Sequence, residues 1–211
     1  MKEAARVEAL LAALKRVYPE AHCELKFRNP LELLVATILS AQCTDKRVNM
    51  VAPQLFKKYK SARDYARAPQ ETLEAEIKST GFYRNKAKAI RSAAADIDSL
   101  HGGKVPDTLD ALTALHGVGR KTANVVLGNA FGKNDGVVVD TNVARLSKRL
   151  KLTKQNDPVK IERDLMKKIP RGDWTDFSHW LIWHGRRRCY ARNPDCEHCE
   201  LVSLCPSAFK G

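Results

Sequence analysis

The chain has 211 residues, of which 44% are hydrophobic and 29% charged, a composition typical of a soluble globular protein. Lys and Arg outnumber Asp and Glu by 37 to 24, and the net charge of +13 favours a polyanionic partner, nucleic acid before membrane. No stretch approaches the roughly 18 consecutive apolar residues of a membrane span, and the charged N-terminal segment lacks a signal-peptide cleavage site, so we expect a cytoplasmic protein.

Helical periodicity runs through almost the whole chain and strand-like alternation is nearly absent, so the sequence predicts an all-α fold. The first helix covers residues 2–18 and ends at Pro19. Pro30 opens an almost wholly apolar segment, LELLVATILSAQ, which we expect to be a buried central helix. The later helices are expected over about 45–59, 61–67, 69–78, 84–100, 106–115, 120–131, 158–169 and 173–188, with one more beginning after Asp140.

Residues 116–119, HGVG, separate two of these helices. Gly117 and Gly119 are expected to supply positive φ angles and to let backbone N–H groups approach a ligand. The amides that open the second helix lack intrahelical partners and favour an anion, such as a DNA phosphate. An ordinary connection between two helices accounts for the two glycines equally well.

Lys121 is the second residue of the helix that follows. The inward face of that helix follows the i, i+3, i+4, i+7 rule and places Lys121 on the opposite side; its members are Ala123, Val126, Leu127 and Ala130. A helix N-terminus, neighbouring Arg120 and partial desolvation favour the neutral amine that Schiff-base chemistry with an aldehyde carbon requires. The alternative is a solvated surface lysine.

Asp140 follows the apolar run 137–139, expected to be an extended connector, and precedes a helix. An aspartate is a good N-cap, which explains the residue without any catalytic role. The helix dipole would also keep its carboxylate ionised near a developing cation. The two interpretations are compatible.

Four of the six cysteines form a C-x6-C-x2-C-x5-C pattern near the C-terminus: Cys189, Cys196, Cys199 and Cys205. Two disulfides are conceivable, but a cytoplasmic chain argues against them, so four close thiols predict a metal site. The spacing alone does not choose between structural zinc and an iron–sulfur cluster. His198 lies between two of these cysteines, and we interpret it as an exposed loop residue.

The segment LHGVGRKTANVVLGNAFG, followed by VVVDTN and the four cysteines, resembles the helix-hairpin-helix DNA glycosylases, and closely their endonuclease III branch. The resemblance runs from about Pro30 to Cys205. It implies two helical lobes with a DNA-binding cleft between them: residues 22–133, a six-helix lobe carrying the hairpin, and residues 1–21 with 134–211, which carry a C-terminal [4Fe–4S] cluster loop. Lys121 and Asp140 would then face each other across the cleft.

The same resemblance implies which residues meet damaged DNA. SAQCTD (40–45) and TGFYRNK (80–86) correspond to the two segments that fill the space left by an extruded base. The DNA-binding residues expected from these segments, the hairpin and the cluster loop are Gln42, Phe82, Tyr83, His116, Gly117, Val118, Gly119, Arg120, Arg186, Arg188 and Arg192. A loop aromatic packed on the core, and solvated arginines, are the alternatives.

The implied activity is that of a bifunctional DNA glycosylase and AP lyase in base excision repair. Lys121 would attack C1′, Asp140 would stabilise the cationic sugar, and the imine would allow β-elimination. The expected substrates are oxidised pyrimidines such as thymine glycol, or abasic sites, in double-stranded DNA, bound by a monomer that is nucleoid-associated in a prokaryote.

Two other functions would be compatible with parts of this sequence. An adenine glycosylase would carry a catalytic glutamate in the first buried helix, but ATILSAQ (36–42) has no acid. A non-catalytic iron–sulfur DNA-binding protein would not need both Lys121 and Asp140. Phe82 stands where the family has an aliphatic residue, His116 where a proline often lies, and Asn142 where a histidine is expected after VDT.

Overall fold

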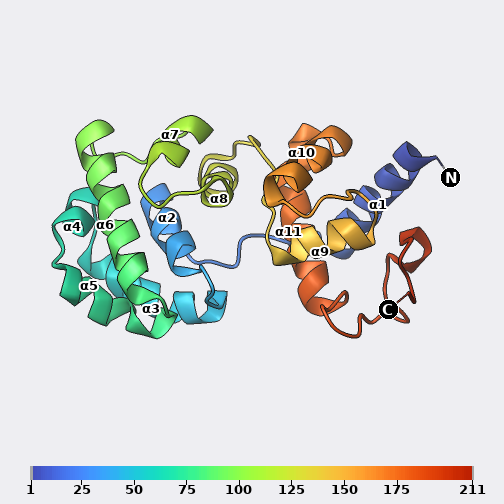
Figure 1. Ribbon diagram of the computed structural model, residues 1–211, viewed down its shortest axis with the longest axis horizontal. Helices are drawn as coiled ribbons and strands as arrows, with labels where there is room; N and C mark the ends of the chain where they lie inside the picture. Colours follow the sequence, from blue (N-terminus) through green and yellow to red (C-terminus); the bar gives the residue numbers. More distant parts are fainter. Residues whose placement is uncertain (1, 211) are drawn as a thin grey trace. The chain divides into compact units, whose positions relative to one another are not determined.

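The computed structural model describes residues 2–210, and every regular element within that range is a helix (Figure 1). The prediction of an all-α fold is confirmed. The α-helices are α1 (Glu3–Val17), α2 (Pro30–Leu39), α3 (Asp45–Lys58), α4 (Ala62–Arg67), α5 (Gln70–Ile77), α6 (Tyr83–Leu100), α7 (Leu109–Ala114), α8 (Arg120–Phe131), α9 (Thr141–Arg149), α10 (Pro158–Lys168) and α11 (Trp174–Arg187). Short 3-10 helices are η1 (Lys78–Thr80), η2 (Arg171–Asp173) and η3 (Val202–Leu204).

Local sequence explains many of the helix starts. The side chains of Asn29, Thr44 and Thr108 accept hydrogen bonds from the backbone at the starts of α2, α3 and α7, as N-cap residues do. Asp157 caps α10 in the same way and is followed by a proline at the first helical position. The apolar run 137–139 is extended and buried but forms no strand, as expected.

The described chain folds into two compact units, each with its own hydrophobic core. One unit, residues 23–133, is built around α2, which packs against α3, α6 and α8. Every residue of α2 from Glu32 to Leu39 is buried, so the apolar segment is the central helix that its composition predicts. This unit carries the helical hairpin and Lys121.

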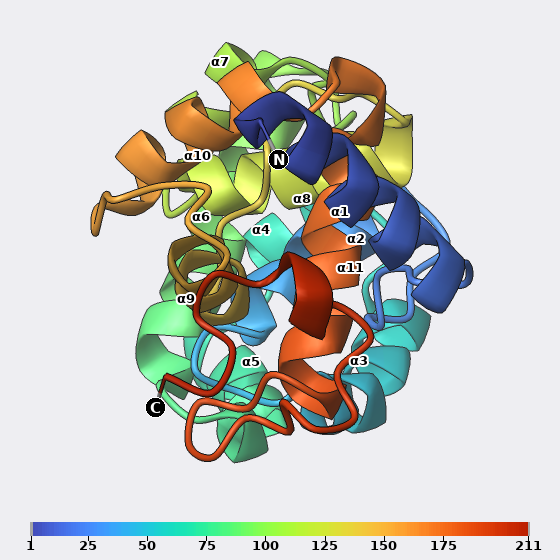
Figure 2. The ribbon, with the colours of Figure 1, turned by 90° about the vertical axis from the view of Figure 1, so that its right-hand side faces the viewer.

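The other unit combines residues 2–22 with 134–210. In it α11 packs against both α1 and α9, and α1 runs alongside α11 in Figure 2. The coil after α11, drawn in red, contains the four clustered cysteines. Asp140 lies in this unit. None of the helices within residues 2–210 has both the length and the apolar character needed to cross a membrane.

Candidate functional site

The turn between α7 and α8 depends on one left-handed glycine. Gly117 has φ +78°, a conformation that side-chain-bearing residues rarely adopt, and a Cβ there would lie 2.8 Å from the Cβ of Ala89 on α6. The positive φ expected at Gly119 is wrong. Gly119 has φ −87° and ψ 169° because it is the extended N-cap residue of α8.

The start of α8 is open to a ligand. No side chain caps the helix at Gly119, and a Cβ at that position would meet nothing within 4 Å. The side chain of Lys121 is exposed, while Ala123, Val126 and Leu127 are buried. Ala130 is partly buried against the same core, so the predicted orientation of this helix is confirmed. An uncapped helix start beside the exposed Lys121 side chain is suited to an anion.

The other residues of this turn differ in whether their side chain is accessible to a ligand. The His116 backbone N–H donates to Oδ2 of Asp96 at 3.0 Å, which ties the turn to α6, and the imidazole is exposed. The side chain of Val118 is buried in the core, so this residue can offer only its backbone to a ligand. Arg120 is half-buried at the first position of α8.

Gln42 and Phe82 occupy two loops that share an uncommon backbone conformation. Gln42 has φ +50° and Phe82 has φ +47°, both in the left-handed region. Both side chains are exposed, and 61% of the Phe82 surface is accessible, so Phe82 is not packed on the core. Tyr83 is half-buried, with the Arg84 guanidinium 5.8 Å from its ring centroid. Left-handed non-glycine residues tend to occur at functional sites.

Asp140 is held by two hydrogen bonds at the start of α9. Its Oδ1 accepts from the Val143 backbone N–H at 2.8 Å, which makes it the N-cap that the sequence predicts. Its Oδ2 accepts from Nδ2 of Asn142 at 3.0 Å. Asn142, the departure from the expected histidine, therefore orients the carboxylate directly.

A chain of contacts leads from Asp140 to the cysteine loop. Oδ1 of Asn142 accepts from the Arg145 guanidinium at 3.0 Å, and the same nitrogen donates to the carbonyls of Gly185 and Cys189 at 3.1 and 2.9 Å. Because Arg145 joins the two segments, the position of Asp140 is coupled to the first cysteine of the loop.

All four clustered cysteines are free thiols and line one cavity with apolar neighbours, including Leu146, Leu150 and Leu201. Burial raises the pKa of Cys199 to about 11 and also raises the pKa of Cys205. Within residues 2–210 no group of three or more His, Cys, Asp or Glu side chains comes together in a way that could hold a metal ion. Four thiols that line one cavity are nevertheless the donor set that a thiolate-bound cluster requires.

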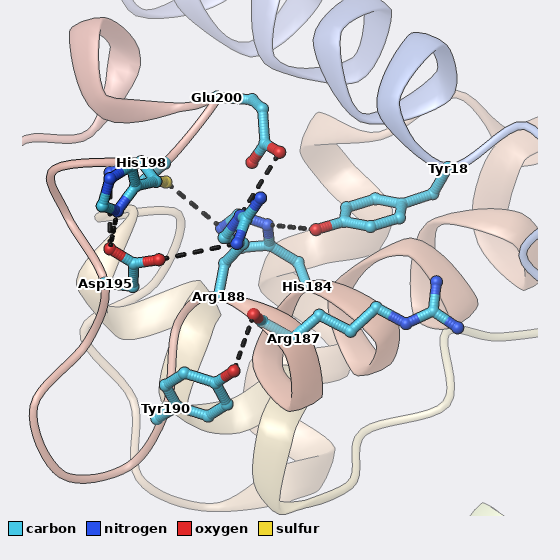
Figure 3. Close-up of polar contacts among 9 residues, drawn as sticks. Tyr18, His184, Arg187, Arg188, Tyr190, Asp195, His198 and Glu200 are labelled. Atoms are coloured by element: carbon cyan, nitrogen blue, oxygen red, sulfur yellow. Dashed lines mark hydrogen bonds and ion pairs between the residues drawn. The ribbon is translucent and has the colours of Figure 1, made fainter.

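Two side-chain nitrogens lie within hydrogen-bonding distance of cysteine sulfur atoms. Nη1 of Arg149 donates to Sγ of Cys189 at 3.2 Å, and the same guanidinium donates to the carbonyls of Tyr190 and Ala191. Nε2 of His184 lies 3.5 Å from Sγ of Cys199, and Nδ1 lies 2.8 Å from the Tyr18 hydroxyl (Figure 3). Burial lowers the pKa of His184 to about 4, so the ring is neutral near pH 7. If Tyr18 donates to Nδ1, the other ring nitrogen donates to sulfur.

The arginines near this loop differ in what they contact. The Arg188 guanidinium forms ion pairs with Asp195 and Glu200 at 3.5 and 3.4 Å, as Figure 3 shows. The side chains of Arg186 and Arg192 are exposed. Arg187 stacks on the Trp183 ring, with its guanidinium carbon 3.7 Å from the centroid. Arg188 is thus held by two carboxylates of its own loop, which neutralise its charge.

The sequence did not point to Asn142, Arg145, Arg149 or His184 as parts of these networks. Arg149 and Cys189 are 40 residues apart, and His184 precedes Cys199 by 15 residues on a different element. No local pattern encodes such pairs. The only signal was the number of basic residues in the segments that precede the cysteines.

Residues 35–171 match the HhH-GPD superfamily of base excision DNA repair proteins. The endonuclease III of Synechocystis sp. is 54% identical over 203 residues, which cover 96% of this chain and 93% of the relative. That of Bacillus subtilis is 48% identical, covering 97% and 94%. The chain belongs to the endonuclease III family. A solved structure described as a trapped endonuclease III–DNA covalent intermediate is also similar, with a TM-score of 0.94, 44% identity and coverage of 100% and 99%.

Membership of the endonuclease III family confirms the resemblance that the hairpin and the cysteine pattern indicated, and with it the helix-hairpin-helix glycosylase fold. The likeness extends through the cysteine loop, because both the relatives and the solved structure are covered almost end to end. Members of this family act in base excision DNA repair, and DNA is the macromolecule that this chain binds.

Proposed function

We propose that this bifunctional DNA glycosylase and AP lyase uses Lys121 as its nucleophile on double-stranded DNA with a damaged base or an abasic site. The observation that carries the proposal is the exposed amine at the uncapped start of α8, on a helix whose opposite face is buried. A helix N-terminus next to the left-handed Gly117 turn offers backbone N–H groups to a DNA phosphate. The amine is thereby held at the DNA backbone, next to the sugar that it must attack.

In the proposed reaction the Lys121 amine attacks C1′ and the damaged base leaves with the electron pair of the glycosidic bond. Loss of a proton from the amine and opening of the sugar ring give an imine between Nζ and C1′. The imine acidifies the C2′ proton. Its removal breaks the bond from C3′ to oxygen, so the strand is cut on the 3′ side of the lesion.

Asp140 is the proposed electrostatic partner of this chemistry. Its two hydrogen bonds, to the Val143 N–H and the Asn142 amide, stabilise a carboxylate in a fixed orientation. A preorganised negative charge stabilises the sugar cation that develops as the base leaves. Since both donors are neutral, the negative charge of Asp140 is available to the substrate.

For the lesion we propose oxidised pyrimidines such as thymine glycol. The base must leave the stack before attack, and Gln42 and Phe82 are the proposed side chains that fill the gap. Both are exposed and lie on loops held in strained conformations. Phosphate contacts by the exposed Arg186 and Arg192 would add sequence-independent affinity.

For the cofactor we propose a [4Fe–4S] cluster held by Cys189, Cys196, Cys199 and Cys205. The supporting observation is that these four free thiols line one cavity, with an N–H donor from Arg149 at Cys189 and a ring nitrogen of His184 beside Cys199. When bound, the cluster supplies iron–thiolate bonds that fix the loop after α11. Arg145, which contacts the Cys189 carbonyl, then transmits that order to α9.

The substrate proposal is tested on two duplexes, one with a single thymine glycol and one with a preformed abasic site. We expect wild-type protein to nick both, and Lys121→Gln to nick neither while it still binds the abasic duplex. Nicking of the abasic duplex alone, with thymine glycol left intact, would contradict the lesion assignment and retain the lyase. Efficient nicking by Lys121→Gln would contradict the assignment of the nucleophile.

A further inference from the structure

Lys86 on α6 is a buried lysine that the proposed chemistry does not use. Only 4% of its surface is accessible. Its ammonium donates to two backbone carbonyls, that of Leu39 at 2.8 Å and that of Thr80 at 2.7 Å. The structure places no carboxylate of the described residues at ion-pair distance from it. Burial lowers the pKa of this ammonium, so its position carries a cost that its contacts must offset.

The two carbonyls lie at the bases of the two loops that carry Gln42 and Phe82. Leu39 is the last residue of α2, three positions before Gln42, and Thr80 ends η1, two positions before Phe82. The other carbonyls at the end of α2 accept from the Ser40 backbone or side chain. Lys86 therefore completes the bonding of this helix end and meets the negative end of its dipole.

Both loop tips need such support. Gln42 and Phe82 have φ angles of +50° and +47°, and a non-glycine residue in that region is strained by about 1–2 kcal/mol. Strained backbone persists only where the surroundings over-determine it. Gly81, with φ +70°, adds a further left-handed residue directly before Phe82. Lys86 is also bonded through its own backbone N–H to the Phe82 carbonyl at 3.1 Å.

We propose that Lys86 is the positioning residue that holds the Gln42 and Phe82 loops in register with each other, so that both side chains enter the duplex together. One ammonium with two short hydrogen bonds fixes the distance between the two loop bases. Since a displacement of about 1 Å at such a site can cost about 100-fold in rate, a shared anchor is more effective than two separate ones. Lys86 itself does not touch the DNA, because its side chain is buried.

This inference rests on the proposed function, in which Gln42 and Phe82 fill the space left by the base. The test uses a duplex with a non-cleavable abasic-site analogue opposite 2-aminopurine, whose fluorescence rises when the base loses its stacking. Lys86→Met keeps the length of the side chain and removes the donors. Lys88→Met is the matched control, because Lys88 is exposed on the same helix and its loss changes the net charge equally.

We expect Lys86→Met to lose most of the fluorescence increase and to excise thymine glycol at least about tenfold more slowly than Lys88→Met. Binding of an undamaged duplex should differ from that of Lys88→Met by no more than about twofold, because phosphate contacts do not need the two loops. In a background that already carries Gln42→Ala and Phe82→Ala, adding Lys86→Met should change the fluorescence little. This non-additivity separates positioning from a general loss of structure.

A full fluorescence increase in folded Lys86→Met would overturn the inference, as would an undiminished effect of Lys86→Met in the doubly substituted background. If Lys86→Met does not fold, Lys86→Gln, which keeps one shorter donor, replaces it. If neither folds, magnetic resonance of isotope-labelled lysine in the wild type decides. The Lys86 ammonium signal should shift on the abasic duplex and stay in place on the undamaged one, and an unchanged signal overturns the inference.

Borohydride trapping of wild-type protein on an abasic duplex distinguishes a failure of the Lys86 inference from a failure of the proposed function. If the wild type forms a trapped adduct and Lys86→Met still gives the full fluorescence increase, only the proposed role of Lys86 is contradicted. A wild type that neither traps nor raises the fluorescence overturns the proposed function and this inference with it.

Discussion

Replacing Gly117 by alanine should damage both the stability of the hairpin unit and its binding to DNA. The φ angle of +78° costs an alanine about 1–2 kcal/mol relative to glycine. The added Cβ would lie 2.8 Å from the Cβ of Ala89 and 3.4 Å from its Cα, so α6 or the turn must shift. Overpacking of this kind costs about 1–3 kcal/mol.

The two effects together predict a loss of about 2–5 kcal/mol in the free energy of unfolding. For a chain of this size that corresponds to a fall in Tm on the order of 5–20 °C. Affinity for an undamaged duplex should fall as well, because under the proposed function the turn presents the first amides of α8 to a DNA phosphate.

Gly119 provides the matched comparison on the other side of the same turn. Its φ of −87° suits any residue, and a Cβ would meet nothing within 4 Å. Gly119→Ser should leave Tm unchanged or raise it slightly, since serine is a good N-cap. The serine hydroxyl would accept a hydrogen bond from an amide that we propose binds phosphate, so DNA affinity should fall without loss of stability. Thermal unfolding and salt-dependent duplex binding measure both effects. A Gly117→Ala protein with unchanged Tm and affinity would refute this account of the turn.

Three further substitutions test other parts of the molecule. Asp140→Asn keeps an acceptor for the Val143 N–H, so Tm should change by less than about 2 °C. Excision of thymine glycol should fall at least about 100-fold, because the negative charge is lost. Normal excision by this variant would contradict a role for Asp140 in the reaction. Arg149→Met removes the donor to Cys189. If the proposed cluster is present, this change should lower the iron content of the purified protein and shift the reduction potential. An unaltered iron content and potential would contradict a role for that hydrogen bond. Burial lowers the pKa of His179 to about 4, so its neutral ring contributes stability in full above pH 6.5 that is lost as the pH falls toward 4. Buried His184 contributes in the same way, so the loss of stability between pH 7 and pH 5 should be smaller in His179→Gln than in the wild type by about 1–2 kcal/mol in denaturant unfolding. Equal pH dependence in both proteins would contradict a contribution from His179.

Much of the fold follows from the spacing of apolar residues and from the residues that begin and end helices. Pro30 and the apolar run after it predict α2, and the spacing of Ala123, Val126 and Leu127 predicts which face of α8 is buried. Asp140 is an N-cap, as an aspartate after an extended apolar run should be. These features are local, so a single sequence contains them.

What the sequence could not supply depends on contacts between distant residues. The identity of glycine does not reveal its φ angle, and Gly119 is extended although its neighbour Gly117 is left-handed. Lys86 looks like any basic residue of an amphipathic helix, yet its ammonium reaches a carbonyl 47 positions away. Asn142 reads as a departure from the family pattern until its amide is seen to bind Asp140.

The central claim is that Lys121 forms a covalent bond with the sugar of damaged DNA. Borohydride reduction on a duplex with an abasic site, followed by mass spectrometry of the cross-linked peptide, tests it most directly. We predict a stable adduct on Lys121 in the wild type and none with Lys121→Ala, although that variant still binds the duplex. An adduct of equal yield with Lys121→Ala, or no adduct with a wild type that binds the duplex tightly, would contradict the claim.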